Sequence, residues 1–186
     1  GNHCVRIFKC PYNLPRCIFQ GWNNPKGIAI CVADTIALMD KGEILQEGAP
    51  YNIYNKPIDP RVASFFSDVN KIYGVVQESR INTSFGLFIT PGIEEGTSVQ
   101  ILIRPQHLKI DFDRNGKGPN PTSEDGVPAR GLVVRARFIG SESLVELRMS
   151  YDGSILKATV PGVFLPAVNT PLWLSMRRDR CFVFKM

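Results

Sequence analysis

The chain has 186 residues, enough for one sizeable domain or two small ones, and its formal net charge is +5. Hydrophobic residues make up 44% and charged residues 21%, which argues against a wholly disordered chain. No apolar run approaches the ~20 residues of a membrane-spanning helix, and the first residues lack the apolar core of a signal peptide. We therefore expect a cytoplasmic protein.

The positive charge is concentrated at the N-terminus. Residues 1–32 contain four Lys or Arg and no Asp or Glu, whereas the rest of the chain contains 18 Lys or Arg and 17 Asp or Glu. Four of the five cysteines also lie in this first stretch. Outside it the sequence shows no basic pattern with interleaved aromatic residues, so we expect no nucleic-acid partner.

The N-terminal third begins without a recognisable element and continues with a predicted β-hairpin. Residues 1–32 show no clean periodicity, and we assign no element to them. Residues 33–48 predict two short strands, Thr35–Met39 and Glu43–Gln46. The stretch Asp40-Lys41-Gly42 between the strands supplies the residues that favour a tight turn.

Residues 49–70 predict helical structure. Asp59 is a good N-cap, and Pro60 suits the first helical position. Apolar residues then recur at the spacing of one helix face, at Val62, Phe65, Phe66 and Val69.

From Lys71 onward the apolar residues recur with a period of two, which is typical of half-buried strands. Residues 113–128 are rich in Gly and Pro and predict a loop between two β halves. Such short strands with turn residues between them indicate a mainly β fold, a small barrel or sandwich. The expected strands are Ile72–Gln77, Leu87–Thr90, Val99–Arg104, His107–Phe112, Gly131–Ile139, Leu144–Met149, Ile155–Val160, Leu172–Met176 and Cys181–Phe184.

Two of these strands have a clear facial pattern, and the turn Gly140-Ser141-Glu142-Ser143 is expected to join them. In the first strand we expect Leu132, Val134, Ala136 and Phe138 on one face and Arg135 and Arg137 on the other. In the second we expect Val145, Leu147 and Met149 on one face and Glu146 and Arg148 on the other.

The sequence contains no motif of nucleotide hydrolysis or nucleophilic catalysis. Its Gly116-Lys117 pair is followed by Gly118, where a phosphate-binding loop needs a hydroxyl residue. A Gly-x-Ser-x-Gly elbow is missing, and the chain has two histidines. We therefore expect no enzymatic activity, no catalytic residue and no bound cofactor.

Two metal-like patterns are incomplete. Asp111 to Gly116 copies the first half of a calcium loop, but Thr122 stands where the bidentate glutamate belongs. One histidine and four cysteines near the N-terminus show no Cys-x-x-Cys spacing, namely His3, Cys4, Cys10, Cys17 and Cys31. We expect no metal site and reduced thiols.

The order of motifs from Ala33 onward resembles the C-terminal part of the ATP-binding subunit of an ABC importer. Residues 33–48, starting Ala33-Asp34-Thr35-Ile36, resemble the end of the nucleotide-binding domain. Residues 53–57 and 62–66 resemble the two short helices that lead to the regulatory domain. The Walker, signature and switch-histidine motifs of the family lie upstream of this point, and residues 1–32 contain none of them.

The β half resembles the transport-associated OB-type (TOBE) regulatory domain. The motifs are Ile103–Leu108, Phe138–Glu146 and Val160–Gly162. The residue pattern of the second motif looks closest to that of the ferric-iron importers, and it is also similar to the patterns of sulfate, polyamine and sugar importers. The resemblance implies structural or regulatory roles for Arg104, Pro105, His107, Gly140, Ser141, Glu142, Ser143, Pro161 and Gly162.

We accordingly expect three parts: residues 1–32 that do not match the family, residues 33–70 as a remnant of the ATPase domain with linker helices, and residues 71–186 as an OB-like regulatory β domain. The resemblance implies a non-catalytic regulatory and dimerisation module for import of an ion or small solute. It also implies a homodimer and, in the full-length family, permease subunits at the inner membrane, with a small anion or ion as effector.

The alternative function is a free-standing oxyanion-binding β domain, for which Ser141 and Ser143 would offer hydroxyl groups from a turn. For the dimer we considered a contribution from the hairpin, whose apolar Ile36, Leu38 and Ile44 and unpaired strand edges would invite a second chain. The local alternative is that residues 1–32 fold back and cover the hairpin.

Overall fold

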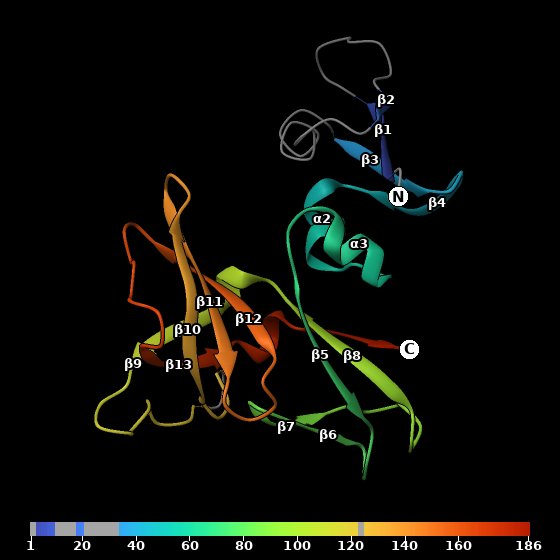
Figure 1. The fold of residues 1–186 in the computed structure, drawn as a ribbon. Helices are drawn as coiled ribbons and strands as arrows, with labels where there is room; N and C mark the ends of the chain where they lie inside the picture. Colours follow the sequence, from blue (N-terminus) through green and yellow to red (C-terminus); the bar gives the residue numbers. More distant parts are fainter. Residues whose placement is uncertain (1–2, 10–17, 21–33, 123–124) are drawn as a thin grey trace. The chain divides into compact units, whose positions relative to one another are not determined.

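The computed structural model describes residues 3–9, 18–20, 34–122 and 125–186. It divides into two compact units, Gly1–Asp68 and Val69–Met186 (Figure 1). The three-part division expected from the sequence, with boundaries after residues 32 and 70, stays a prediction. Within the described ranges, none of the helices combines the length and the apolar character needed to cross a bilayer.

The first unit is built on a four-stranded antiparallel sheet with the order β2-β1-β3-β4. Its strands are β1 (His3–Lys9), β2 (Ile18–Gln20), β3 (Thr35–Asp40) and β4 (Glu43–Gly48). The predicted hairpin is confirmed as β3 and β4, which pair from Asp40 opposite Glu43 onward.

The hairpin turn is formed by Lys41 and Gly42, which have φ angles of 50° and 89°. Two consecutive positive φ angles are the signature of the two-residue turn whose twist matches that of the flanking strands. Lys41 and Gly42 therefore form the tight turn that the sequence predicted.

Strands β1 and β2 lie in the segment to which the sequence analysis assigned no element. β1 pairs with β3 over its whole length, with Val5 opposite Leu38, and β2 pairs with the other edge of β1. The expectation of an unpaired β3 edge is therefore wrong, and the fold-back alternative is the one observed. Ile36 and Leu38 are also buried rather than exposed, whereas Ile44 is 51% exposed.

The predicted helical region forms two short helices, α2 (Pro50–Asn55) and α3 (Pro60–Phe65). Asp59 caps α3 as predicted, since its carboxylate accepts a hydrogen bond of 2.7 Å from the backbone N–H of Arg61. Because α3 ends at Phe65, Val69 does not extend its apolar face. Ile53, Val62 and Phe65 pack with Ile36 and Leu38 in the core of this unit.

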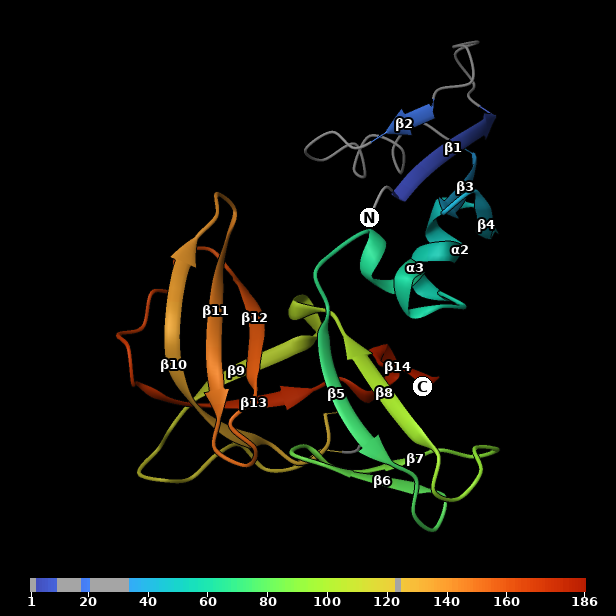
Figure 2. The same ribbon diagram turned by 45° about the vertical axis from the view of Figure 1, so that its right-hand side comes forward.

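The second unit is a β structure in three sheets, with the orders β12-β11-β10-β13-β9, β14-β8-β5 and β6-β7 (Figures 1 and 2). The edge strands β9 and β12 of the five-stranded sheet contact each other, so this sheet curls into a half-barrel. The predicted mainly β, OB-like fold, preceded by a hairpin and two short helices, is confirmed. The elements are β5 (Asn70–Val75), β6 (Arg80–Thr83), β7 (Gly86–Ile89), β8 (Ser98–Ile103), η1 (Pro105–His107), β9 (Leu108–Phe112), β10 (Ala129–Phe138), β11 (Glu142–Met149), β12 (Ile155–Pro161), β13 (Pro171–Met176), η2 (Arg178–Arg180) and β14 (Phe182–Lys185).

The core of the second unit is a continuous apolar cluster, to which all three sheets contribute side chains. Every strand from β5 to β13 contributes at least one buried or half-buried side chain to it. This packing supplies the hydrophobic stabilisation that the alternating pattern predicted. Fully buried members include Ile81, Phe85, Ile101, Leu147, Ala158 and Leu174.

The facial pattern of β10 differs from the prediction because the strand contains a β-bulge. The register with β11 shifts between Val133 and Arg135, which leaves Val134 as the extra residue. Before the bulge Val133 is buried and Leu132 is 39% exposed, so Leu132 does not share a face with Ala136. In β11 the prediction is confirmed, because Val145, Leu147 and Met149 are buried.

Strand β6 was not predicted from the sequence. Its residues are mainly polar and only four in number, and the turn before it is made by Glu78 and Ser79 with φ angles of 51° and 59°. Neither residue type signals a positive φ, so the turn leaves little trace in the sequence.

Candidate regulatory site

The nine residues carried over from the family motifs fall into two groups in the second unit. Arg104, Pro105 and His107 lie at the corner between β8 and β9. Gly140 to Ser143 and Pro161-Gly162 come together at the end of the β10–β11 hairpin, because Glu142 pairs with Pro161.

The hairpin end is held by one backbone hydrogen bond from the end of β12 and by another across its own turn. The N–H of Gly162 donates to the carbonyl of Ser141 at 3.0 Å, and the N–H of Ile139 donates to the carbonyl of Glu142 at 2.9 Å. Gly140 and Gly162 have φ angles of 107° and 75°, which explains why glycine occupies both positions.

Ser143 is the centre of this network. Its side chain is fully buried, and its hydroxyl donates to the carbonyl of Gly162 and accepts from the N–H of Phe164, both at 2.8 Å. The expectation that Ser143 lies in a turn is wrong, since it lies within β11. Its hydroxyl proton is already used inside the fold, so Ser143 is a positioning residue for the segment after β12. Ser141 remains exposed in the turn.

The segments that Ser143 ties together expose three apolar side chains. Ile139, Val163 and Leu165 are 53%, 73% and 54% exposed. We call these three residues the hairpin rim. They make the end of the hairpin and the segment after β12 apolar toward solvent, a character that contact surfaces share.

The corner between β8 and β9 is built around a buried arginine. Arg104 is 1% exposed, it occupies the residue position just before η1, and its guanidinium carbon lies 5.1 Å from the centre of the Phe182 ring. The carbonyl of Arg104 accepts from the N–H of His107 at 3.0 Å, and the carbonyl of His107 accepts from the N–H of Arg177 at 3.2 Å. These contacts join η1 to the segment that precedes η2.

His107 lies in a positive environment. Burial and then the charges of Arg104, Arg180 and Arg177 lower the pKa of His107, while Asp179 acts in the opposite direction. Asp179 itself pairs with Arg177 at 2.8 Å and with Arg180 at 3.2 Å, and the hydrogen bond from Arg177 is the main cause of its lowered pKa. The imidazole is therefore held neutral at neutral pH.

The calcium-like stretch is organised by protein donors. The carboxylate of Asp113 accepts from Trp173 at 3.2 Å, from Arg130 at 2.8 Å and from the N–H of Gly116 at 2.8 Å. The Trp173 bond is the first cause of the lowered pKa of Asp113. Asp113 thus fixes the start of the Gly- and Pro-rich loop rather than presenting free oxygens to a cation.

The N-terminal group of one histidine and four cysteines stays a prediction without a metal site. Cys10, Cys17 and Cys31 lie outside the described residues, and His3 and Cys4 are described by their backbone in β1. The fifth cysteine, Cys181, donates to the carbonyl of Arg177, and burial raises its pKa to about 12, so it is an unreactive thiol.

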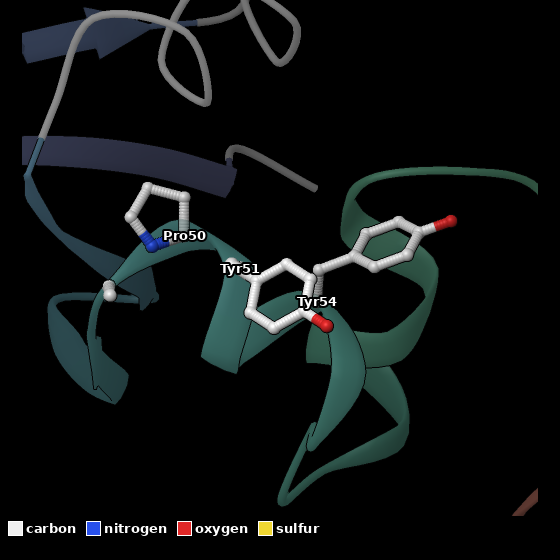
Figure 3. Close-up of a pocket in the computed structure, with 4 residues that line it drawn as sticks. Pro50, Tyr51 and Tyr54 are labelled. Atoms are coloured by element: carbon white, nitrogen blue, oxygen red, sulfur yellow. The ribbon is translucent and has the colours of Figure 1, made fainter.

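One cavity in the first unit was not foreseen. It has a volume of about 370 Å³ and is lined by Ala49, Pro50, Tyr51 and Tyr54 along α2 (Figure 3). The side chain of Tyr51 is 75% exposed. None of the nine motif residues lies here, so the cavity is separate from the candidate site.

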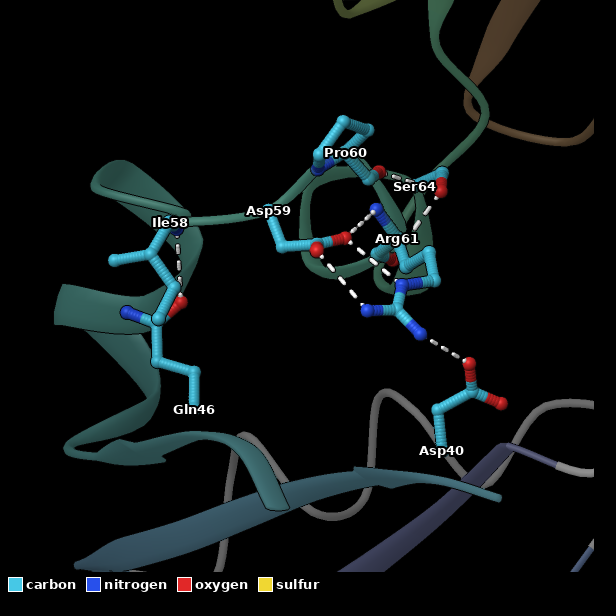
Figure 4. Close-up of polar contacts among 7 residues, drawn as sticks. All are labelled: Asp40, Gln46, Ile58, Asp59, Pro60, Arg61 and Ser64. Carbon is cyan, nitrogen blue, oxygen red and sulfur yellow. Dashed lines mark hydrogen bonds and ion pairs between the residues drawn. The ribbon is translucent and has the colours of Figure 1, made fainter. Parts of the chain in front are cut away.

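Polar contacts fix the helices of the first unit to its sheet (Figure 4). Arg61 pairs with Asp40 at the end of β3 at 2.7 Å and with Asp59 at 3.1 Å. Gln46 in β4 donates to the carbonyl of Lys56 and accepts from the N–H of Ile58, and so holds the connection between α2 and α3. The network is structural and contains no nucleophile or base arrangement.

Comparison with known families agrees with this architecture. Residues 101–184 match the TOBE domain, so the second unit carries a TOBE domain. Together with the relatives described below, this match supports the resemblance of the chain to the C-terminal part of an ABC importer ATP-binding subunit.

Two relatives from Rhodococcus jostii (strain RHA1) illustrate this similarity. They are the Fe(3+) ions import ATP-binding proteins FbpC 2 and FbpC 1, each 27% identical over 144 residues, which is 77% of this chain. The match covers 38% of the length of each relative. A solved structure of the cytoplasmic molybdate-binding protein ModG, with molybdate bound, overlaps with a TM-score of 0.47 and 12% identity over 61% of this chain and 94% of that one.

Proposed function

We propose that this chain is a non-catalytic regulatory and dimerisation module of an ABC importer for ferric iron. The single observation that carries the proposal is the TOBE domain whose family-motif residues, centred on buried Ser143, hold an exposed apolar rim. The names of the two FbpC relatives support ferric iron as the transported ion. The absence of a phosphate-binding loop from the 186 residues supports the non-catalytic role.

The proposed partner is a second copy of the chain, with contacts made by the second unit. The β3 edge is already paired, which removes the reason for assigning the contact to the hairpin. In a complete importer, permease subunits are the further proposed partners, on the cytoplasmic face of the membrane. A small anion or ion is the proposed effector.

A calorimetric titration of the full chain with ATP and Mg²⁺ tests the non-catalytic part of the proposal. We expect no saturable heat, because the sequence contains no Gly-rich loop followed by a Lys-Ser/Thr pair for the phosphates. Binding at micromolar affinity would refute it. Titration of the same sample with molybdate tests the oxyanion-binding alternative, for which the hydroxyl of Ser143 is already occupied.

A further inference from the structure

Strand β3 is paired along both of its edges. β4 pairs with one edge and β1 with the other, both antiparallel. The pairing with β1 runs from His3 opposite Asp40 to Lys9 opposite Thr35, so no stretch of the β3 edge is left open. The centre of β3 is fully enclosed, with Ile36 and Ala37 both 0% exposed.

The strand that closes this edge does not belong to the family pattern. The motifs shared with importer ATPases begin at Ala33, and β1 ends at Lys9. β1 therefore covers this edge with residues that the shared motifs do not include.

We propose that β1 is a self-complementing strand that closes the β3 edge to a second copy of this chain. An open β3 is a template for antiparallel pairing with another β3 about a two-fold axis, which gives a closed dimer. The outer edge of β1 is covered in turn by β2, which has three residues and is a short, poor template. A β-bulge between Ile7 and Lys9 ends the regular pairing at the far end of β1.

The experiment compares the full chain with a variant carrying Val5→Pro and Arg6→Pro. Consecutive backbone N–H groups of a strand point to opposite edges, so the two prolines together remove one donor that faces β3. The matched control, Val5→Thr with Arg6→Lys, changes the same positions and keeps both N–H groups. Amide hydrogen exchange is measured at Ile36, Ala37 and Leu38, and sedimentation velocity is measured over a range of concentrations.

The proposal predicts that amide exchange in β3 becomes about tenfold faster or more in the proline variant. It also predicts new species heavier than the wild-type species, because each chain then carries an open β3 edge in addition to the contact proposed for the second unit, while exchange in β11 and the behaviour of the control stay unchanged. Unchanged exchange in β3 would show that β1 does not protect this edge. Faster exchange without a heavier species would show that the exposed edge does not recruit a second copy. Either result overturns the proposal and leaves the function assigned to the second unit untouched.

Discussion

The side chain of Asn70 makes hydrogen bonds to both the backbone N–H and the backbone carbonyl of Lys157. The side-chain amide of Asn70 donates to the carbonyl of Lys157 at 2.8 Å, and its oxygen accepts from the N–H of Lys157 at 2.7 Å. Asn70 starts β5 and is 5% exposed, while Lys157 lies in β12, an edge strand of the five-stranded sheet. One side chain therefore takes the place of a neighbouring strand and joins two sheets.

Replacing Asn70 with alanine should destabilise the second unit by about 1–3 kcal/mol, because two partly buried backbone groups lose their partner. Urea denaturation followed by Trp173 fluorescence, in a Trp22→Phe background, measures the loss. Asn82→Ala is the matched control, since Asn82 is exposed in β6. A loss below about 0.5 kcal/mol for Asn70→Ala, within the usual range for surface substitutions, would contradict the joining role.

Ser143→Ala should lower the free energy of unfolding by about 1–3 kcal/mol, because the buried hydroxyl makes hydrogen bonds to both a backbone carbonyl and a backbone N–H. The segment around Val163 should also lose order, which faster amide exchange at Phe164 would report. Ser141→Ala, two residues earlier and exposed in the turn, should change neither quantity. Equal effects of the two alanine substitutions would show that Ser143 has no special positioning role.

His107 should make the second unit less stable in mild acid. Its pKa is lowered in the folded chain, so below the ordinary histidine pKa of about 6.5 the unfolded chain binds more protons than the folded chain. This contribution is complete above about pH 6.5 and is lost as the pH falls toward the folded-state pKa. His107→Gln should flatten thermal stability between about pH 5 and pH 7. If His3→Gln flattened it and His107→Gln did not, the assignment to His107 would fail.

Gly118 should not accept a side chain. A Cβ atom built there would lie 2.5 Å from an atom of the Trp173 ring, and Trp173 is anchored by its bond to Asp113. Gly118→Ala should therefore shift the emission of Trp173 and lower stability by about 1–3 kcal/mol through overpacking. Gly153→Asn is the control, because no atom lies within 4 Å of its Cβ position and Asn tolerates its φ of 72°. An unchanged spectrum for Gly118→Ala would contradict the packing described here.

Most of the fold could be predicted because its elements are specified locally. The Asp59 cap, the Lys41-Gly42 turn and the alternation in β11 each follow from a few adjacent residues. The bulge at Val134 could not be predicted, since it depends on the register with a second strand. The role of Ser143 was missed for the same reason, because both of its partners lie about twenty residues further along the chain.

The pairing of β1 with β3 could not be predicted, because the two strands lie still further apart in the sequence. The sequence of residues 3–9 has strand-forming character, yet its partner begins at Thr35, beyond two breaker-rich stretches. A strand of that kind is recognisable only when the free edge it covers is known.

The central claim is that this chain is a regulatory module that dimerises through its second unit without nucleotide. Sedimentation equilibrium of residues 69–186 at tens of micromolar, with and without ATP and Mg²⁺, tests it most directly. The account predicts a dimer of the same mass and affinity in both conditions. A monomer in both conditions, or a dimer that forms only with ATP and Mg²⁺, would contradict it.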